Sequence, residues 1–296
     1  MRTIRARRVL VLANPAAGPR KGRDEGGAVA RAVSRAGVRC ELERTRAPGD
    51  ASRAAASAPA AGFDLVLAVG GDGTVHEAAQ GIAGSGVALG VAPAGTMNLL
   101  ARVLGIPLDA PRAAELLVLA GRRLAFRPGR AGERLFVLMA GIGFDAWVLR
   151  EVLRRARGRP SMRHYAWGAL RGLRTYRFPE IRFDAGDGRR LRATSAVVGR
   201  APLYGGWLRP TPRASLERDE LEICVFRGRS GPDYLRMAPS LWSGSHVDRA
   251  DAEARIVTAV RGESHDPDVP VQLDGELAGT LPMEFGVSGR ILVLAT

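Results

Sequence analysis

The chain has 296 residues, enough for about two domains with real cores, and its 46% hydrophobic and 25% charged residues are a globular composition. This excludes a disordered chain and a disulfide-stabilised miniprotein, and two cysteines are too few for a metal cluster. The formal net charge is +14, but its 44 basic residues include a single lysine, Lys21. We attribute most of this charge to arginine bias in the composition and expect no nucleic-acid partner.

No segment is expected to span a membrane. The longest uncharged stretch, residues 78–101, is broken by several glycines and by Pro93, and the apolar run at residues 9–13 is too short for a secretory signal. We therefore expect a cytoplasmic protein, and the sequence leaves open a peripheral attachment to the inner face of the membrane.

The first 120 residues alternate short apolar runs with helical patterns, which is typical of a parallel sheet covered by helices. Strands are expected at residues 9–13, 38–43, 64–69 and 87–91. Asp24, Asp50 and Asp109 are suitable N-caps for the helices between and after them. The pattern predicts an α/β domain over residues 1–122.

After residue 121 the pattern changes to alternating strands separated by turns that contain Gly and Pro. Examples are residues 134–139, 189–198 and 221–226. This predicts an all-β or sandwich-like domain over residues 123–283. One arginine-rich helical insertion, residues 147–176, interrupts it, and residues 284–296 are expected to form a further strand.

The strongest local signal is the sequence Val-Gly-Gly-Asp-Gly-Thr at residues 69–74, which follows an expected buried strand and begins a helix. Glycines there let backbone N–H groups approach a phosphate, and a helix N-terminus favours an anion. Asp72 is itself anionic, so its presence beside phosphates is reasonable if Mg²⁺ lies between them. The alternative is an ordinary turn in which Asp72 caps the helix.

Two further loops follow neighbouring strands, Asn14 to Gly18 after the first strand and Pro93 to Asn98 after the fourth. Because the carboxyl ends of parallel strands meet at one edge of a sheet, the three loops predict a nucleotide cleft. Lys21 could reach phosphates from the first loop, or it could be a chance survivor of the arginine bias. The fingerprints of P-loop NTPases and of ordinary Rossmann dehydrogenases are absent from the sequence.

Together these residues resemble the diacylglycerol kinase catalytic family, which includes bacterial lipid kinases, sphingosine kinases and ceramide kinases. The resemblance covers most of the chain. The matching motifs are Asn14-Pro15 with Gly18, Thr45 before Gly49-Asp50-Ala51, Gly70 to Thr74 with Glu77, Gly95-Thr96 with Asn98 and Ala101, Gly141 to Ala146, Gly205-Gly206 with Pro212 and Ala214, and Asp274-Gly275-Glu276.

The resemblance implies an ATP-dependent kinase with an NAD kinase-like α/β domain, a β-sandwich that carries the lipid, a nucleotide cleft between the two domains, and residues 284–296 packed back on the first domain. Asp72 would help to hold the magnesium ion of ATP. Glu276 matches the family's proposed general base, which would take the proton of a lipid hydroxyl. The nucleotide-binding positions would be Asn14, Lys21, Thr45, Gly70, Gly71, Asp72, Gly73, Thr74, Glu77, Gly95, Thr96 and Asn98.

The resemblance also implies a second, structural Mg²⁺ held by backbone oxygens and an aspartate at Leu216, Asp219 and Leu221. Oxygen ligands suit this ion. The chain departs from the family here, because Glu220 stands where the family usually has a glycine, and this alters the expected turn.

The arginine-rich region has two interpretations. Residues 150–192 contain 13 arginines against four acidic residues, and aromatic and aliphatic side chains lie among them. Such a segment can attach to an anionic bilayer, or it can pack its apolar residues in a core and leave its arginines solvated.

The leading interpretation is a lipid kinase that uses ATP and Mg²⁺ and acts on diacylglycerol or a related glycerolipid at a membrane. The alternatives are an NAD kinase-like phosphotransferase, which shares the Gly-Gly-Asp-Gly-Thr loop, and a non-catalytic lipid- or nucleotide-binding protein of the same fold. The sequence identifies neither the acceptor lipid nor the oligomeric state, and a homodimer is compatible with it.

Overall fold

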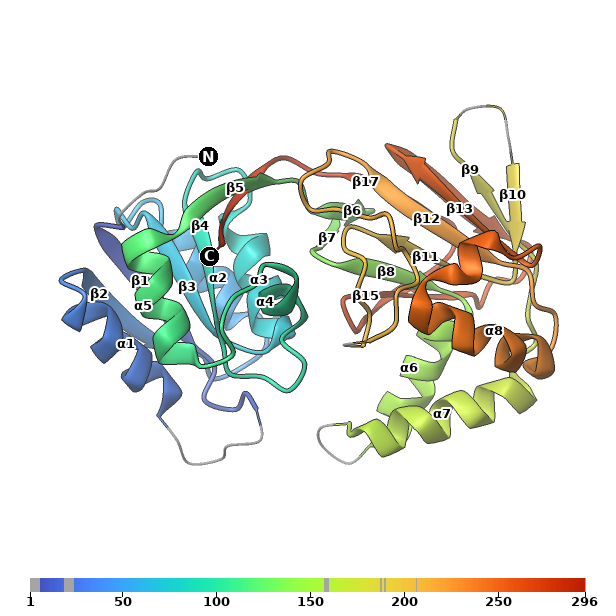
Figure 1. The fold of residues 1–296 in the computed structure, drawn as a ribbon, viewed down its shortest axis with the longest axis horizontal. Coiled ribbons are helices and arrows are strands. Elements are labelled where there is room, and N and C mark those ends of the chain that lie inside the picture. The colour runs from blue at the N-terminus through green and yellow to red at the C-terminus, as the bar shows by residue number, and fades with distance from the viewer. Residues whose placement is uncertain are drawn as a thin grey trace. The chain divides into compact units, whose positions relative to one another are not determined.

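The computed structural model describes residues 6–18, 24–156, 160–186, 188, 190–205 and 207–295. The chain forms two compact units, residues 1–128 with 289–296, and residues 129–288 (Figure 1). The domain boundaries expected from the sequence, after residues 122 and 283, lie a few residues before the observed ones, which fall after residues 128 and 288. The reason is that β5 (Arg122–Phe126) completes the first sheet and β17 (Met283–Val287) pairs within the second unit.

The first unit is a six-stranded sheet with the order β2-β1-β3-β4-β18-β5. All neighbouring strands are parallel except β18 and β5. Every residue of β3 and β4 is buried, as expected for central strands covered on both faces. The remaining strands of this sheet are β1 (Arg8–Ala13), β2 (Arg39–Arg44), β3 (Leu65–Gly70), β4 (Ala88–Pro93) and β18 (Ile291–Ala295).

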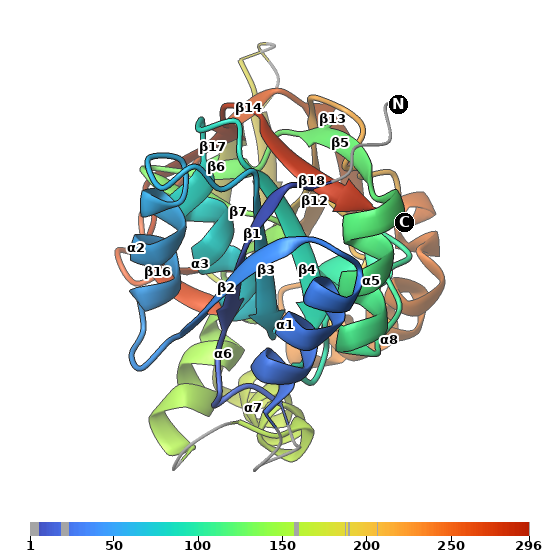
Figure 2. The same ribbon diagram turned by 90° about the vertical axis from the view of Figure 1, so that its left-hand side faces the viewer.

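Helices cover both faces of this sheet. Figure 2 shows α1 and α5 on one face and α2 and α3 on the other. Asp24 and Asp109 cap their helices as predicted, whereas α2 begins at Asp50 itself and has Gly49 as its cap, with φ of +85°. The helices are α1 (Glu25–Arg35), α2 (Asp50–Ser57), α3 (Asp72–Ile82), α4 (Leu99–Val103) and α5 (Ala110–Ala120).

Strand β18 comes from the far end of the chain. It pairs in parallel with β4 and antiparallel with β5, and its side chains Ile291, Val293 and Leu294 are buried. A strand that follows the whole second unit therefore lies inside the first sheet. Burial of these apolar side chains stabilises the packing of the last residues of the chain against the sheet formed by its first 128 residues.

The second unit contains two six-stranded antiparallel sheets, which confirms the sandwich prediction. Phe136, Phe183 and Phe285 are fully buried in its core. One sheet has the order β10-β9-β14-β17-β6-β7 and the other β13-β12-β11-β8-β15-β16. The strands are β6 (Gly129–Ala131), β7 (Arg134–Phe136), β8 (Met139–Ile142), β9 (Ile181–Asp184), β10 (Arg190–Ala193), β11 (Ser195–Gly199), β12 (Leu221–Phe226), β13 (Ala252–Val257), β14 (Ala259–Ser264), β15 (Pro270–Leu273), β16 (Glu276–Thr280) and β17.

The single strand expected at residues 189–198 is two strands in different sheets. The chain crosses between β10 and β11 at Thr194, which is buried. The Thr194 backbone N–H donates to the carbonyl of Phe226 at 2.8 Å, and its hydroxyl lies 3.1 Å from that of Tyr234. Alternating apolar residues continue through the crossing, so the pattern alone did not reveal it.

The predicted helical insertion consists of two packed helices, α6 (Phe144–Arg155) and α7 (Met162–Thr175). Gly168 and Gly172 allow close approach. A Cβ on Gly168 would lie 2.9 Å from Val152, and one on Gly172 would lie 2.9 Å from Phe144. The guanidinium of Arg155 lies over the Trp167 ring, 4.4 Å from its centroid.

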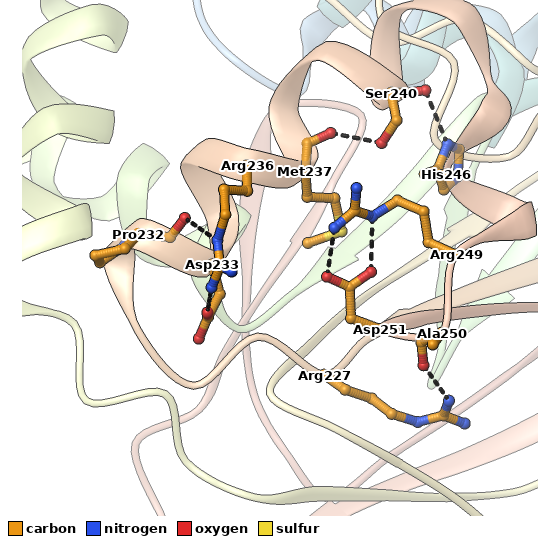
Figure 3. Close-up of polar contacts among 10 residues, drawn as sticks. All are labelled: Arg227, Pro232, Asp233, Arg236, Met237, Ser240, His246, Arg249, Ala250 and Asp251. Atoms are coloured by element: carbon orange, nitrogen blue, oxygen red, sulfur yellow. Dashed lines mark hydrogen bonds and ion pairs between the residues drawn. The ribbon is translucent and has the colours of Figure 1, made fainter.

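A third helix, α8 (Gly231–Ser243), is followed by the short helix η1 (Ser245–Asp248). Polar contacts link residues within α8 and in the segments beside it (Figure 3). Arg249 donates two hydrogen bonds to Asp251 at 2.7 and 2.8 Å, and buried His246 lies 3.4 Å from the carbonyl of Ser240. Within the described part of the chain, no helix is long and apolar enough to cross a membrane.

Candidate functional site

Three predicted loops meet at the carboxyl edge of the first sheet. The backbone N–H of Asn14, after β1, donates to Val69 of β3 at 2.9 Å, and that of Ala94, after β4, donates to Gly70 at 2.9 Å. The N–H of Thr45, after β2, donates to Ala13 at 2.9 Å. Sheet pairing thus brings the ends of four strands together, as the sequence predicted.

The glycines of these loops are required by close backbone contacts. A Cβ on Gly95 would lie 2.3 Å from the Cα of Gly71, and one on Gly18 would lie 2.0 Å from the carbonyl oxygen of Ala94. Gly18 also has a φ of +75°, which side chains rarely adopt. The three loops therefore form one packed unit of backbone.

The loop after β3 leads directly into α3. Gly71 is its N-cap, and Asp72 and Gly73 are its first residues. Gly73 is exposed, and the first turn of a helix has N–H groups without intrahelical partners. Together with the helix dipole, this end of α3 is suited to a phosphate.

Asp72 joins the second loop to the third, and Asn98 holds the third loop together. Asp72 Oδ1 accepts a hydrogen bond from the N–H of Leu99 at 2.7 Å. Asn98 has a φ of +50°, and its side chain accepts from the N–H of Gly95 at 2.9 Å and donates to the Gly95 carbonyl at 3.0 Å. The Asn98 side chain thus shapes its own loop, while Thr96 at the tip is exposed.

Asn14, Thr74 and Glu77 hold the surrounding elements. Asn14 Nδ2 donates to the hydroxyl of buried Thr74 at 3.2 Å, and Ala51, in the first turn of α2, donates to Glu77 Oε2 at 3.2 Å. The side chains of Asn14, Thr74 and Glu77 thus make contacts within the protein that hold β1, α2 and α3 together. Lys21 and Gly206 lie outside the described residues.

Glu276 belongs to the second unit and begins β16. The two residues before it, Asp274 and Gly275, form a tight hairpin turn with φ of +49° and +91°, typical of type I′. Glu276 is exposed, and its Oε2 lies 3.1 Å from a guanidinium nitrogen of Arg134. The hairpin thus presents a carboxylate at the surface, and Arg134 is a contact that the sequence did not predict.

The Asp274 carboxylate has a structural role. It accepts hydrogen bonds from three consecutive backbone N–H groups, those of Val137, Leu138 and Met139, at 2.5 to 2.9 Å. These bonds attach the hairpin to the start of β8.

Gln272 and Asp145 support the hairpin from the interior. Gln272 is buried; its Oε1 accepts from the N–H of Gly275 at 2.7 Å and its Nε2 donates to Asp145 Oδ2 at 2.8 Å. The hydroxyl of Tyr204 donates to the other oxygen of Asp145. Burial raises the pKa of Asp145, and both hydrogen bonds oppose that shift. A Cβ on Gly141 would lie 1.9 Å from Asp145 Oδ2, which explains this glycine of the Gly141 to Ala146 motif.

The residues expected to hold a structural Mg²⁺, Leu216, Asp219 and Leu221, lie elsewhere in the second unit, and an arginine contacts one of the expected oxygens, the Leu216 carbonyl. Arg200 donates to the carbonyl oxygens of Leu216 at 3.4 Å and Arg218 at 2.6 Å, and also to that of Glu220. Leu221 begins β12 and pairs with β13, and Asp219 is exposed. A metal ion does not fit at the Leu216 carbonyl, because a guanidinium already binds that oxygen and the two carbonyls on either side of Asp219.

Comparison with known proteins decides the family. Residues 8–129 match the family model described as diacylglycerol kinase catalytic domain, and residues 139–296 match that described as YegS C-terminal NAD kinase beta sandwich-like domain. The chain belongs to the diacylglycerol kinase family. It is therefore a member of a kinase family, and its two units correspond to the two matched domains.

Individual relatives agree with this assignment. The chain is 32% identical to a diacylglycerol kinase of Mycobacterium tuberculosis H37Rv over 80% of this chain and 78% of that protein. It is 27% identical to a diacylglycerol kinase of Bacillus subtilis 168 over 94% and 93% of the two chains. A crystal structure of a diacylglycerol kinase from Bacillus anthracis superposes with a TM-score of 0.73 at 19% identity, over 99% of this chain and 98% of that one. This last likeness shows the fold.

Two carboxylates of the hairpin are expected to respond differently to substitution. Asp274→Ala leaves three backbone N–H groups without their acceptor, which we expect to cost about 2–4 kcal/mol and lower the Tm by roughly 5–10 °C. Glu276→Gln changes only an exposed ion pair, so we expect a change within about 1 kcal/mol. Thermal unfolding followed by circular dichroism measures both, and equal destabilisation by the two variants would contradict these roles.

Asp145 is expected to make stability depend on pH. Its pKa is raised in the folded state, so above about pH 4 the native protein keeps a proton that the unfolded chain has lost, and stability falls as pH rises through the folded pKa. Asp145→Asn stays neutral, and its amide can accept from Gln272 and donate to Tyr204. We expect the Tm of this variant, relative to the unsubstituted protein, to rise between pH 4 and pH 7. A difference that is constant with pH would show that Asp145 titrates like an exposed carboxyl group.

Proposed function

We propose that the chain is an ATP- and Mg²⁺-dependent lipid kinase that transfers the γ-phosphate to a hydroxyl of diacylglycerol or a related glycerolipid. The observation that carries this proposal is the packing of Gly18, Gly71 and Gly95 around the N-terminus of α3. That arrangement suits a polyphosphate, in a chain whose relatives are named diacylglycerol kinase.

The first unit would bind the nucleotide. Gly73 and Thr96 are the exposed parts of the second and third loops, so their backbone and hydroxyl groups are available to phosphate oxygens. Asp72, at the start of α3, supplies the carboxylate oxygen that Mg²⁺ prefers as a ligand, and its bond to Leu99 orients the side chain. When bound, the ion neutralises charge on the phosphates.

The second unit would supply the base. The Glu276 carboxylate takes the proton of the lipid hydroxyl. The hydroxyl oxygen forms a bond to the γ-phosphorus of ATP, and the bond between that phosphorus and the bridging oxygen breaks, so that ADP leaves. The turn at Asp274 and Gly275 and the ion pair with Arg134 hold Glu276 at the surface, where a lipid hydroxyl can reach it.

Removing either catalytic carboxylate is expected to abolish transfer. Asp72→Ala and Glu276→Gln should each lower kcat by roughly 100-fold or more, since a general base contributes about 10²–10⁴-fold. Glu284→Gln is a matched control, because Glu284 is an exposed carboxylate that also lies near an arginine, Arg130. Transfer of labelled phosphate from ATP to diacylglycerol in mixed micelles measures these rates. Phosphorylation of NAD with no labelling of lipid would contradict the proposal.

We also propose that the second unit meets an anionic bilayer through its helices. In α8, Leu235, Ala238 and Trp242 recur at helical spacing, yet all three are exposed, Leu235 at 57% and Trp242 at 63%. Trp207 is 43% exposed and stacks on Trp242 with ring centroids 6.5 Å apart. An apolar stripe on a surface helix normally faces a core, and tryptophan favours the membrane interface.

The surrounding charge favours an anionic surface. The guanidinium of Arg209, two residues after Trp207, is exposed and has no ion-pair partner among the described residues. On α6 and α7, a hollow of about 330 Å³ is lined by Arg155, Ser161, Arg163, His164 and Trp167. The described residues provide no ion pair for Arg155 or Arg163 either, so these arginines are available to lipid phosphates.

Loss of the two tryptophans is expected to weaken membrane binding. The double variant Trp207→Ser, Trp242→Ser should bind vesicles of phosphatidylglycerol and phosphatidylcholine about tenfold or more weakly. Added salt should weaken the binding of the unsubstituted protein to the same vesicles. Ile256→Ser, an exposed apolar residue of β13, is the control. Vesicle sedimentation measures binding. Unchanged sedimentation together with a shift in oligomeric state would show that a second copy covers this surface instead.

A further inference from the structure

Arg200 is a buried cation that contacts the loop where the resemblance implied a metal ion. It directly follows β11, and none of its side chain is exposed. Its two terminal nitrogens donate to the carbonyl oxygens of Leu216, Arg218 and Glu220, all in the loop that leads into β12. Three carbonyls of one loop therefore converge on one guanidinium.

The charge state and shape of Arg200 suit this position. Burial lowers its pKa to about 10 and nearby Asp219 opposes that shift, so the side chain is protonated at neutral pH. A guanidinium has several N–H donors in a planar fork and can bind several carbonyls at once. A divalent cation at the same oxygens would face a fixed positive charge at close range, with a large desolvation cost.

We propose that Arg200 takes the place of the structural metal ion, so that residues 215–220 are ordered by a cation belonging to the chain itself. The loop then needs no divalent ion to bring its carbonyls together. This also accounts for Glu220, because the loop uses its backbone carbonyl and leaves its side chain exposed.

The loop lies where its order affects the sandwich. It leads into β12, which pairs with both β11 and β13, and Arg200 itself follows β11. Glu222, fully buried in β12, accepts from the N–H of Arg213 at 2.7 Å and from its guanidinium at 3.2 Å. Arg213 thus attaches the residues before the loop to β12, and Arg200 attaches the loop to the end of β11.

The first test uses the unsubstituted full chain without nucleotide. Amide hydrogen exchange of residues 215–220 is measured in EDTA and in MgCl₂, which separates this loop from any ion bound at Asp72. We expect the same protection in both buffers. Protection that is lost in EDTA and restored by Mg²⁺ would overturn the proposal.

Variants provide the second test. Arg200→Gly leaves three loop carbonyls without their donor, so we expect its Tm to fall by roughly 5–10 °C and residues 215–220 to lose protection. Arg200→Lys keeps the charge without the fork and should show a smaller fall, and it serves as the test if Arg200→Gly does not fold. Arg218→Ala is the control, because it removes an exposed arginine of the same loop and keeps the carbonyl. A Tm of Arg200→Lys and Arg200→Gly equal to that of Arg218→Ala would overturn the proposal.

Discussion

The close approach of backbone to backbone at the carboxyl edge of the first sheet is the constraint on which the proposed nucleotide site depends. A Cβ on Gly95 would clash with the backbone of Gly71, a Cβ on Gly18 would clash with the carbonyl of Ala94, and a Cβ on Gly71 would lie 3.3 Å from the Cα of Gly95. Because these loops are packed on each other, the start of α3 and Asp72 keep a defined position. Asn98 and Glu77 add side-chain contacts that maintain the same arrangement.

In the second unit, carboxylates are divided between structure and chemistry by what they bind. Asp274 is occupied by three backbone N–H groups and Asp145 by Tyr204 and Gln272, so both serve to hold the hairpin. Among the described residues, Glu276 has an exposed ion pair with Arg134, and we propose that it exchanges this contact for a substrate. Asp274 and Asp145 are thus occupied by internal partners, whereas Glu276 is exposed on a rigid turn, which is the position we propose for the base.

Arginine has three different roles in this arginine-rich chain. Arg134 pairs with a carboxylate, Arg200 binds carbonyls of a loop from within the fold, and exposed residues such as Arg209 are those that we propose to meet a lipid surface. Composition does not distinguish these roles, because each depends on which oxygens the fold places around the guanidinium. The +14 charge is therefore weak evidence about partners, and the surroundings of single arginines are stronger evidence.

Local sequence patterns were sufficient to predict the α/β and sandwich classes and the three loops at one sheet edge, because apolar periodicity and glycine spacing are local properties. Tertiary structure decided the rest. Thr194 divides one apparent strand between two sheets, β18 enters the first sheet from the far end of the chain, and Gln272 connects Asp145 to the hairpin of Glu276. The convergence of three carbonyls on Arg200 was likewise not predictable, since its partners lie 16 to 20 residues away. Such contacts depend on how strands pair at long range, and no local pattern records that pairing.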